Sequence, residues 1–217
     1  MILFFLVLLT FSAINGQTPY GEKPLKITVL YETLCGDSRA FFRNQLPDAY
    51  PALKNYIDIQ FVPFGKANSF HNGVDYQFAC HFGPVECYGN KLQSCMINTF
   101  DRNADIHYEF TKCYMTSKSP RSEGEAHDLA YECARAIGLP KERMDSCMNS
   151  REGILLQLRD EQATKSLQNP LQFVPTIVYD GVYDKALQDQ SLTNFRGVIC
   201  QLLLAKGVND NFIQRIC

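Results

Sequence analysis

Cysteine is the residue type whose number and placement could carry chemistry in this sequence of 217 residues. Cys35 stands apart because it follows an apolar segment directly and precedes a segment with helical spacing. A cysteine at the first turn of a helix faces unpaired backbone N–H groups and the positive end of the helix dipole, which stabilise its thiolate. This placement predicts an exposed, reactive thiol whose chemistry is attack on a disulfide. The alternatives are an inert buried thiol and a partner in an intermolecular bridge.

The other eight cysteines are expected to form structural disulfides. They are Cys80, Cys87, Cys95, Cys113, Cys133, Cys147, Cys200 and Cys217. The first three are separated by six and seven residues, which does not match the short C-x₂₋₄-C pairs of zinc modules, so we expect no metal and no cofactor. Eight cysteines permit 105 pairings, so the connectivity stays open. The local pairs Cys133 with Cys147 and Cys200 with Cys217 are working hypotheses.

A strand and a helix are predicted on either side of Cys35. Residues 25–31 alternate with period 2 and have one fully apolar side, which is typical of a strand. Residues 39–50 have helical spacing until Pro47, and residues 57–65 are rich in β-branched and aromatic residues, as in a second strand. A right-handed crossover makes these strands parallel and places Cys35 at the carboxyl end of the first strand, where α/β folds keep their sites.

The rest of the chain predicts a helical insertion followed by a return to the core. From about residue 68 to 168, helix patterns such as those of residues 126–137 and 154–168 replace strand signals. Strand signals return at residues 173–183, where Asp180-Gly181 predicts a hairpin turn, and residues 191–207 predict a helix capped by Ser191. This order is the thioredoxin arrangement, in which a cis-proline, here Pro175, lies against the active-site cysteine. The predicted fold class is therefore α/β (α+β), a thioredoxin-like core with a disulfide-rich helical insertion.

The amino terminus predicts export. Residues 1–16 are apolar and uncharged and indicate a signal peptide cleaved after Gly16, which leaves a single domain over residues 17–217 and no membrane anchor. Export places the cysteines in an oxidising compartment. The chain has no Asn-x-Ser/Thr site for a glycan-borne lysosomal address, so we expect a secreted, extracellular protein, with the lysosome as the alternative. A formal net charge of −2 without a Lys/Arg run argues against nucleic-acid binding.

Three segments of the chain carry a family resemblance: LYETLCGDSRAFF, CHFGPVECYGNKLQSC and FVPTIVYDGVY. Together they resemble the gamma-interferon-inducible lysosomal thiol reductase (GILT) family. The middle segment is close to the family signature C-Q-H-G-x-x-E-C-x-x-N-x-x-x-x-C, which is matched at Cys80, Gly83, Glu86, Cys87, Asn90 and Cys95. The resemblance spans essentially the whole mature chain. It implies a thioredoxin-like fold with a helical insert and the reduction of protein disulfides at acid pH.

The chain departs from the family pattern at two places. His81-Phe82 replaces the Q-H pair, so no role is carried over to that histidine. Cys35-Gly36-Asp37-Ser38 replaces C-x-x-C. In a dithiol reductase the second cysteine attacks the mixed disulfide made by the first and releases the product. Ser38 cannot perform this step. If the other eight cysteines form four bridges, Cys35 is the unpaired ninth, as the loss of a partner at position 38 would leave it.

The sequence therefore favours weak or absent reductase turnover. We expect contact with other proteins, including disulfide-containing ones, either non-covalently or by a mixed disulfide through Cys35. The alternatives are an oxidoreductase that borrows its resolving thiol from a small molecule and a fold that only offers a binding surface. Either a monomer or a Cys35-linked dimer is compatible with one free thiol.

Several residues near Cys35 have predicted roles. The expected substrate-contact residues are Gly36, Asp37, Val174 and Pro175. The charged residues Glu32, Asp37 and Arg39 are candidates for tuning the Cys35 thiol, but we expect them to be solvated, as is commoner at the start of a helix. His71, His81, His107 and His127 form no nucleophile or metal pattern and are expected to be surface or structural residues.

Overall fold

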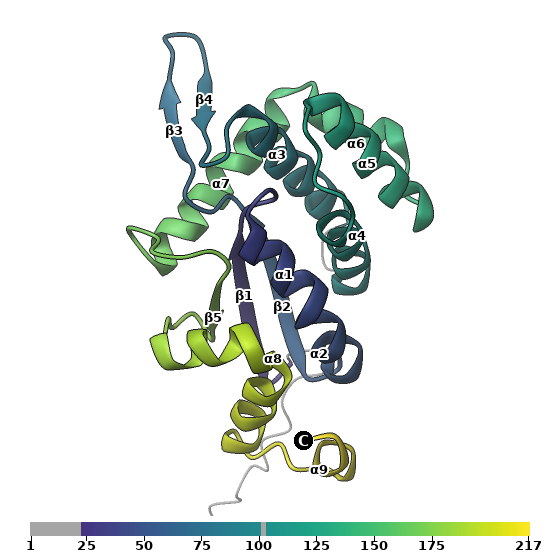
Figure 1. The fold of residues 1–217 in the computed structure, drawn as a ribbon, viewed down its shortest axis with the longest axis vertical. Helices are drawn as coiled ribbons and strands as arrows, with labels where there is room; N and C mark the ends of the chain where they lie inside the picture. The colour runs from purple at the N-terminus through teal and green to yellow at the C-terminus, as the bar shows by residue number, and fades with distance from the viewer. Residues whose placement is uncertain (1–22, 101–102) are drawn as a thin grey trace, which may run out of the picture.

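A three-stranded sheet forms the centre of the computed structural model, which describes residues 23–100 and 103–217 (Figure 1). Its strands are β1 (Leu25–Tyr31), β2 (Ile57–Pro63) and β5 (Thr176–Tyr179), in the order β2-β1-β5. β1 pairs with β2 in parallel, as predicted, and with β5 antiparallel. The central strand is buried on both faces from Ile27 onward, because helices cover both sides of the sheet. The predicted signal peptide lies outside the described residues.

The helices next to the sheet are α1 (Gly36–Asn44), α2 (Leu46–Leu53), α8 (Lys185–Ala205) and α9 (Asn211–Ile216). α1 and α8 begin earlier than the sequence patterns indicate, and α2 and α9 were not predicted as separate helices. Phe42 of α1 packs on the face of the sheet over β1 and β2, with its ring centroid 4.8 Å from that of Tyr31 and 5.6 Å from that of Phe61. The prediction that Ser191 caps a helix is wrong. The cap is Asp184, whose side chain accepts from the N–H of Leu187, and Ser191 is buried within α8.

A β-hairpin and five helices lie between β2 and β5 in the chain. They are β3 (Asn68–His71), β4 (Tyr76–Ala79), α3 (Pro84–Thr99), α4 (Ala104–Thr116), α5 (Glu123–Ala136), α6 (Lys141–Met148) and α7 (Arg151–Leu167). The hairpin, which the sequence analysis missed, projects beyond the helices at one end of the molecule (Figure 1). Conversely, the hairpin predicted at Asp180-Gly181 is reduced to one bridge between Tyr179 and Val182.

Four disulfides join the eight cysteines other than Cys35. They are Cys80–Cys87, Cys95–Cys147, Cys113–Cys133 and Cys200–Cys217. The hypothesis that pairs Cys133 with Cys147 is wrong, whereas the pair Cys200–Cys217 is confirmed.

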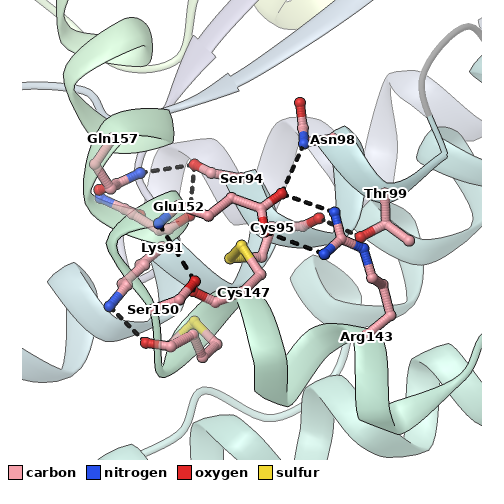
Figure 2. Close-up of a disulfide and its surroundings, with 12 residues drawn as sticks. Lys91, Ser94, Cys95, Asn98, Thr99, Arg143, Cys147, Ser150, Glu152 and Gln157 are labelled. Carbon is pink, nitrogen blue, oxygen red and sulfur yellow. Dashed lines mark hydrogen bonds and ion pairs between the residues drawn. A yellow bond between two sulfur atoms is a disulfide. The ribbon is translucent and has the colours of Figure 1, made fainter.

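The Cys95–Cys147 disulfide ties α3 to α6 in the centre of the helical region. Figure 2 shows it between the Arg143–Glu152 ion pair on one side and the hydrogen bond from Gln157 to Ser94 on the other. Both sulfur-bearing residues are fully buried. The disulfide therefore holds the helical region together from within.

No helix within residues 23–100 and 103–217 has both the length and the apolar character needed to cross a membrane.

Candidate active site

Cys35 lies at the carboxyl end of β1 and is the N-cap residue of α1. Its carbonyl accepts the first hydrogen bond of the helix, from the N–H of Arg39 at 3.0 Å. Its Sγ lies 3.6 Å from the carbonyl oxygen of Val174, and the Val174–Pro175 peptide bond is cis, as predicted. The expectation of an exposed thiol is wrong, because Cys35 is only 7% exposed.

The residues after Cys35 divide between surface and interior. Gly36 and Asp37 are exposed, and Asp37 borders a small cavity of about 160 Å³ that Phe173 and Leu192 also line. Ser38 is fully buried one helical turn from Cys35, and its Oγ accepts a hydrogen bond from the N–H of Glu32 at 3.4 Å. The hydroxyl is thus part of the support of the loop that leads to Cys35.

Cys35 is the one free cysteine of the chain. All nine cysteines belong to the described residues, and the other eight are disulfide-bonded. No second free thiol in this chain is available to attack a mixed disulfide formed at Cys35.

Arg39 fixes α1 to the helical region instead of pointing into solvent. The expectation that it is solvated is wrong, because it is 4% exposed. Its guanidinium donates to the carbonyl of Thr33 at 2.9 Å, to that of Tyr114 at 3.4 Å and to that of Ser117. Burial lowers its pKa, and three carbonyl acceptors partly compensate for the loss of water. Sequence patterns do not reveal this role, since a charged residue in a first helical turn is usually exposed.

The GILT-like signature forms the start of α3, and this helix packs against the loop before Cys35. Asn90 Oδ1 accepts from the backbone N–H of Thr33 at 3.1 Å and lies 2.9 Å from Thr33 Oγ1. Gly89 permits this close approach, because a Cβ there would lie 2.7 Å from Thr33 Oγ1 and 2.9 Å from the hydroxyl of Tyr114. The signature residues were identified from the sequence, but their contact with the Cys35 loop was not.

Two buried carboxyl groups lie behind the same loop. Glu32 was expected to be solvated, but it is fully buried; its Oε1 accepts from the N–H of Lys66 at 2.7 Å and its Oε2 lies 3.2 Å from His81 Nδ1. Glu86 is also fully buried, and its Oε1 accepts from the N–H of Phe82 at 3.1 Å. Burial, together with the negative charge of Glu32, raises the pKa of Glu86 to about 7.

The Cys80–Cys87 disulfide fixes the turn that presents these groups. It closes the turn between β4 and α3, where Gly83 caps the helix at φ +82°. A residue with a side chain rarely adopts that backbone conformation. The turn also carries His81, so the histidine for which no role was predicted lies against Glu32.

Comparison with families and curated proteins gives a consistent result. The family model described as Gamma interferon inducible lysosomal thiol reductase (GILT) matches residues 26–137. A Gamma-interferon-inducible lysosomal thiol reductase-like protein of Anopheles gambiae is 33% identical over 208 residues, which cover 90% of this chain and 84% of the relative. GILT-like protein 1 of Drosophila melanogaster is 33% identical over 201 residues, covering 87% and 78%.

Solved structures that resemble this one include two DsbA proteins. DsbA of Chlamydia trachomatis is 17% identical with a TM-score of 0.59, over 88% of this chain and 89% of that one. The reduced form of DsbA from Mycobacterium tuberculosis is 12% identical with the same TM-score, over 89% and 87%. At these identities the similarity concerns the fold, and the predicted thioredoxin-like fold is confirmed.

Proposed function

The chain belongs to the gamma-interferon-inducible lysosomal thiol reductase (GILT) family, and from this membership we propose that it is a secreted relative that binds other proteins through the face around Cys35. In this proposal Cys35 forms mixed disulfides that the chain cannot release by itself. Disulfide reductase turnover is therefore weak or absent.

The observation that carries the proposal is Ser38 in the place of the second cysteine. In the first step the Cys35 thiolate attacks one sulfur of a substrate disulfide, which forms a mixed disulfide and expels the other sulfur as a thiolate. In a dithiol enzyme the second thiolate then attacks the Cys35 sulfur, and the substrate leaves fully reduced. The Ser38 hydroxyl forms no disulfide and is occupied with the N–H of Glu32. The exchange consequently stops after the first step.

The residues around Cys35 suit an extended partner segment. Gly36 and Asp37 are exposed beside the thiol, whereas Val174, whose carbonyl oxygen lies 3.6 Å from the sulfur, and the adjoining Pro175 are buried. We assign these four residues to partner contact. The cavity beside Asp37, lined by apolar side chains such as Phe173 and Leu192, is large enough for a small apolar group of the partner.

The alternative function is a monothiol oxidoreductase. An external thiolate, for example that of a small-molecule thiol, would attack the mixed disulfide, free the substrate thiol and leave Cys35 bound to the small molecule until a second thiolate restores it. The free Cys35 thiol favours this reading as much as it favours trapping, so the rate of release separates the two.

Secretion is part of the proposal. It is supported by the uncharged apolar residues 1–16 and by the absence of an Asn-x-Ser/Thr site. The names of several relatives describe them as lysosomal, and the lysosome is the alternative location. Expression of the full chain in an animal cell line should yield protein in the medium that begins at Gln17. Retention within acidic vesicles would support the alternative.

Trapping of partners tests the proposed chemistry. Wild-type protein and the Cys35→Ala variant are each incubated with a disulfide-bonded test protein such as insulin, quenched with acid and separated without reductant. We expect a reductant-sensitive adduct with wild type and none with Cys35→Ala. Adducts that persist for hours with a small-molecule thiol present favour trapping, whereas rapid loss with release of reduced insulin favours the monothiol oxidoreductase. The absence of any adduct would exclude both.

A further inference from the structure

The loop Glu32–Cys35, named the active-site loop below, rests on one face of α3. Glu86, Gly89 and Asn90 are spaced i, i+3 and i+4 along that helix, so they lie on the same face. Asn90 holds the backbone and hydroxyl of Thr33, and Gly89 allows the close approach. The carboxyl of Glu86 completes this face. Any change in that carboxyl therefore acts directly on the support of the loop.

The carboxyl of Glu86 is incompletely satisfied in its ionised form. Its Oε1 accepts from the N–H of Phe82, and the backbone N–H of Leu34, next to Cys35, lies near enough to favour the charged form. Among the described residues, however, Oε2 has no hydrogen-bond partner of good geometry. A buried carboxylate with an unpartnered oxygen is costly, whereas a protonated carboxyl in the same place is tolerated.

The charged groups around this carboxyl do not neutralise it. Glu32, in the active-site loop itself, adds a second negative charge. From the turn before α3, the half-exposed His81 places its Nδ1 3.2 Å from Glu32 Oε2, and its effect on the pKa of Glu86 is smaller than that of burial and of Glu32. After β2, Lys66 contributes its backbone N–H to Glu32.

Within the described residues, the charged groups that act on Glu86 are Glu32 and His81, and the nearby helices α1 and α4 add no compensating charge. On α1, Arg39 directs its guanidinium to backbone carbonyls. On α4, the buried hydroxyl of Tyr114 has no partner within the described part of the chain. Two buried carboxyls thus share one half-exposed histidine.

We propose that Glu86 is a positioning residue for Cys35, which keeps the active-site loop packed on α3 while its carboxyl is protonated and loosens that loop when it ionises beside Glu32. The inference rests on the proposed function only in taking Cys35 as the reactive group. Because Cys35 is almost fully covered, access to its sulfur requires the loop or the Val174 segment to move.

The direction of the effect follows from proton linkage. The closed loop raises the pKa of Glu86 to about 7 from an ordinary value of 4.5, so the closed loop binds the proton more tightly than an open one does. The closed state, in which the active-site loop is packed on α3, is therefore most favoured at acid pH, and its stability falls as the pH rises through 7. Between pH 5.5 and 8.5 the limiting change in the opening equilibrium is about 30-fold, and we expect about tenfold because an open loop retains part of the neighbouring charge.

The rate at which N-ethylmaleimide alkylates Cys35 measures this opening. Wild type and the Glu86→Gln variant, whose amide keeps the size of the side chain and its acceptor for the Phe82 N–H, are compared at each pH. We expect the ratio of the wild-type rate to the variant rate to rise about tenfold between pH 5.5 and 8.5. A direct electrostatic effect would act in the opposite sense, because an ionised Glu86 disfavours the thiolate. A ratio that is flat or falls with pH overturns the proposal.

Two further variants serve as a control for whole-protein unfolding and as a substitute for Glu86→Gln. Asp160→Asn makes the same kind of substitution at a buried carboxyl on α7 that bonds Ser94 and makes no hydrogen bond to the active-site loop, so its ratio should stay flat. A matching rise would show that whole-protein unfolding controls alkylation and would overturn the proposal. If Glu86→Gln does not fold, Glu32→Gln removes the neighbouring charge and should reduce the pH dependence in part, because burial still raises the pKa of Glu86. A Glu32→Gln profile that matches wild type also overturns the proposal.

The readout needs no partner protein. If no insulin adduct forms but the alkylation ratio rises as expected, the proposed function is wrong and the role of Glu86 stands. A flat ratio together with stable adducts would do the reverse.

Discussion

The wild-type protein should lose stability as the pH rises from about 4 to 8, and replacing Asp160 by asparagine should abolish much of this loss. Asp160 is 5% exposed, and its carboxylate accepts a hydrogen bond from Ser94 of α3. Burial raises its pKa to about 6 from an ordinary 3.8, which outweighs the opposing effects of Ser94 and Arg159. The folded protein therefore binds this proton more tightly than the unfolded chain does.

The magnitude follows from the same pKa. Because the folded-state value is raised, the stabilisation from the proton is complete below the unfolded value and is lost as the pH rises through 6. The difference between 3.8 and about 6 corresponds to at most about 3 kcal/mol of unfolding free energy. The asparagine variant lacks this dependence, so its stability relative to wild type should improve by up to about 3 kcal/mol between pH 4 and 8.

Urea unfolding at pH 4, 5, 6, 7 and 8, with the disulfides intact, measures this difference. Other titrating groups, Glu86 included, contribute equally to both proteins and cancel. Asp128→Asn, at an exposed carboxyl on α5, is the matched control and should change the free energy of unfolding by less than about 0.5 kcal/mol at every pH. A difference between Asp160→Asn and wild type that is constant with pH would refute the reasoning.

Three further outcomes follow from the packing and the disulfides. The double variant Cys95→Ala/Cys147→Ala removes a link across 52 residues and should lose about 4 kcal/mol in denaturant unfolding; a loss below about 1 kcal/mol would contradict the chain-entropy account. Gly89→Ala should lower the free energy of unfolding by about 1–3 kcal/mol, because the added methyl group meets Thr33 and Tyr114. Gly124→Ala on α5, whose added methyl group would have its nearest neighbour at 3.9 Å, should be neutral or slightly stabilising. Equal effects of the two variants would show that the close approach of α3 is not needed. Thiol titration of the unfolded, unreduced protein should find one thiol, which alkylation maps to Cys35, and a count of zero or three would contradict the pairing.

The sequence was sufficient for the parts of the fold that local patterns encode. The period-2 segment of β1, the second strand and the parallel crossover between them follow from apolar spacing, and they place Cys35 at the strand end. The exposed hairpin β3–β4 was missed because its strands are not buried on either face, so no apolar alternation marks them.

Long-range contacts were not readable from local patterns. The partner of Cys95 lies 52 residues away, and no local feature favours it over nearer cysteines. Glu32 and Arg39 were expected in solvent because charged residues are rarely buried. Their burial depends on the loop before Cys35, on α4 and on the turn after β2, which supply the donors and acceptors. The candidate thiol was thus predictable, but the charged groups that surround it were not.

The role of position 38 is best measured by insulin reduction with wild type and with Ser38→Cys, at acid and neutral pH and with the same thiol reductant. We expect little or no turnover by wild type and a clear gain when position 38 can supply the second thiolate. Wild-type turnover comparable to that of Ser38→Cys would show that Ser38 does not limit reduction.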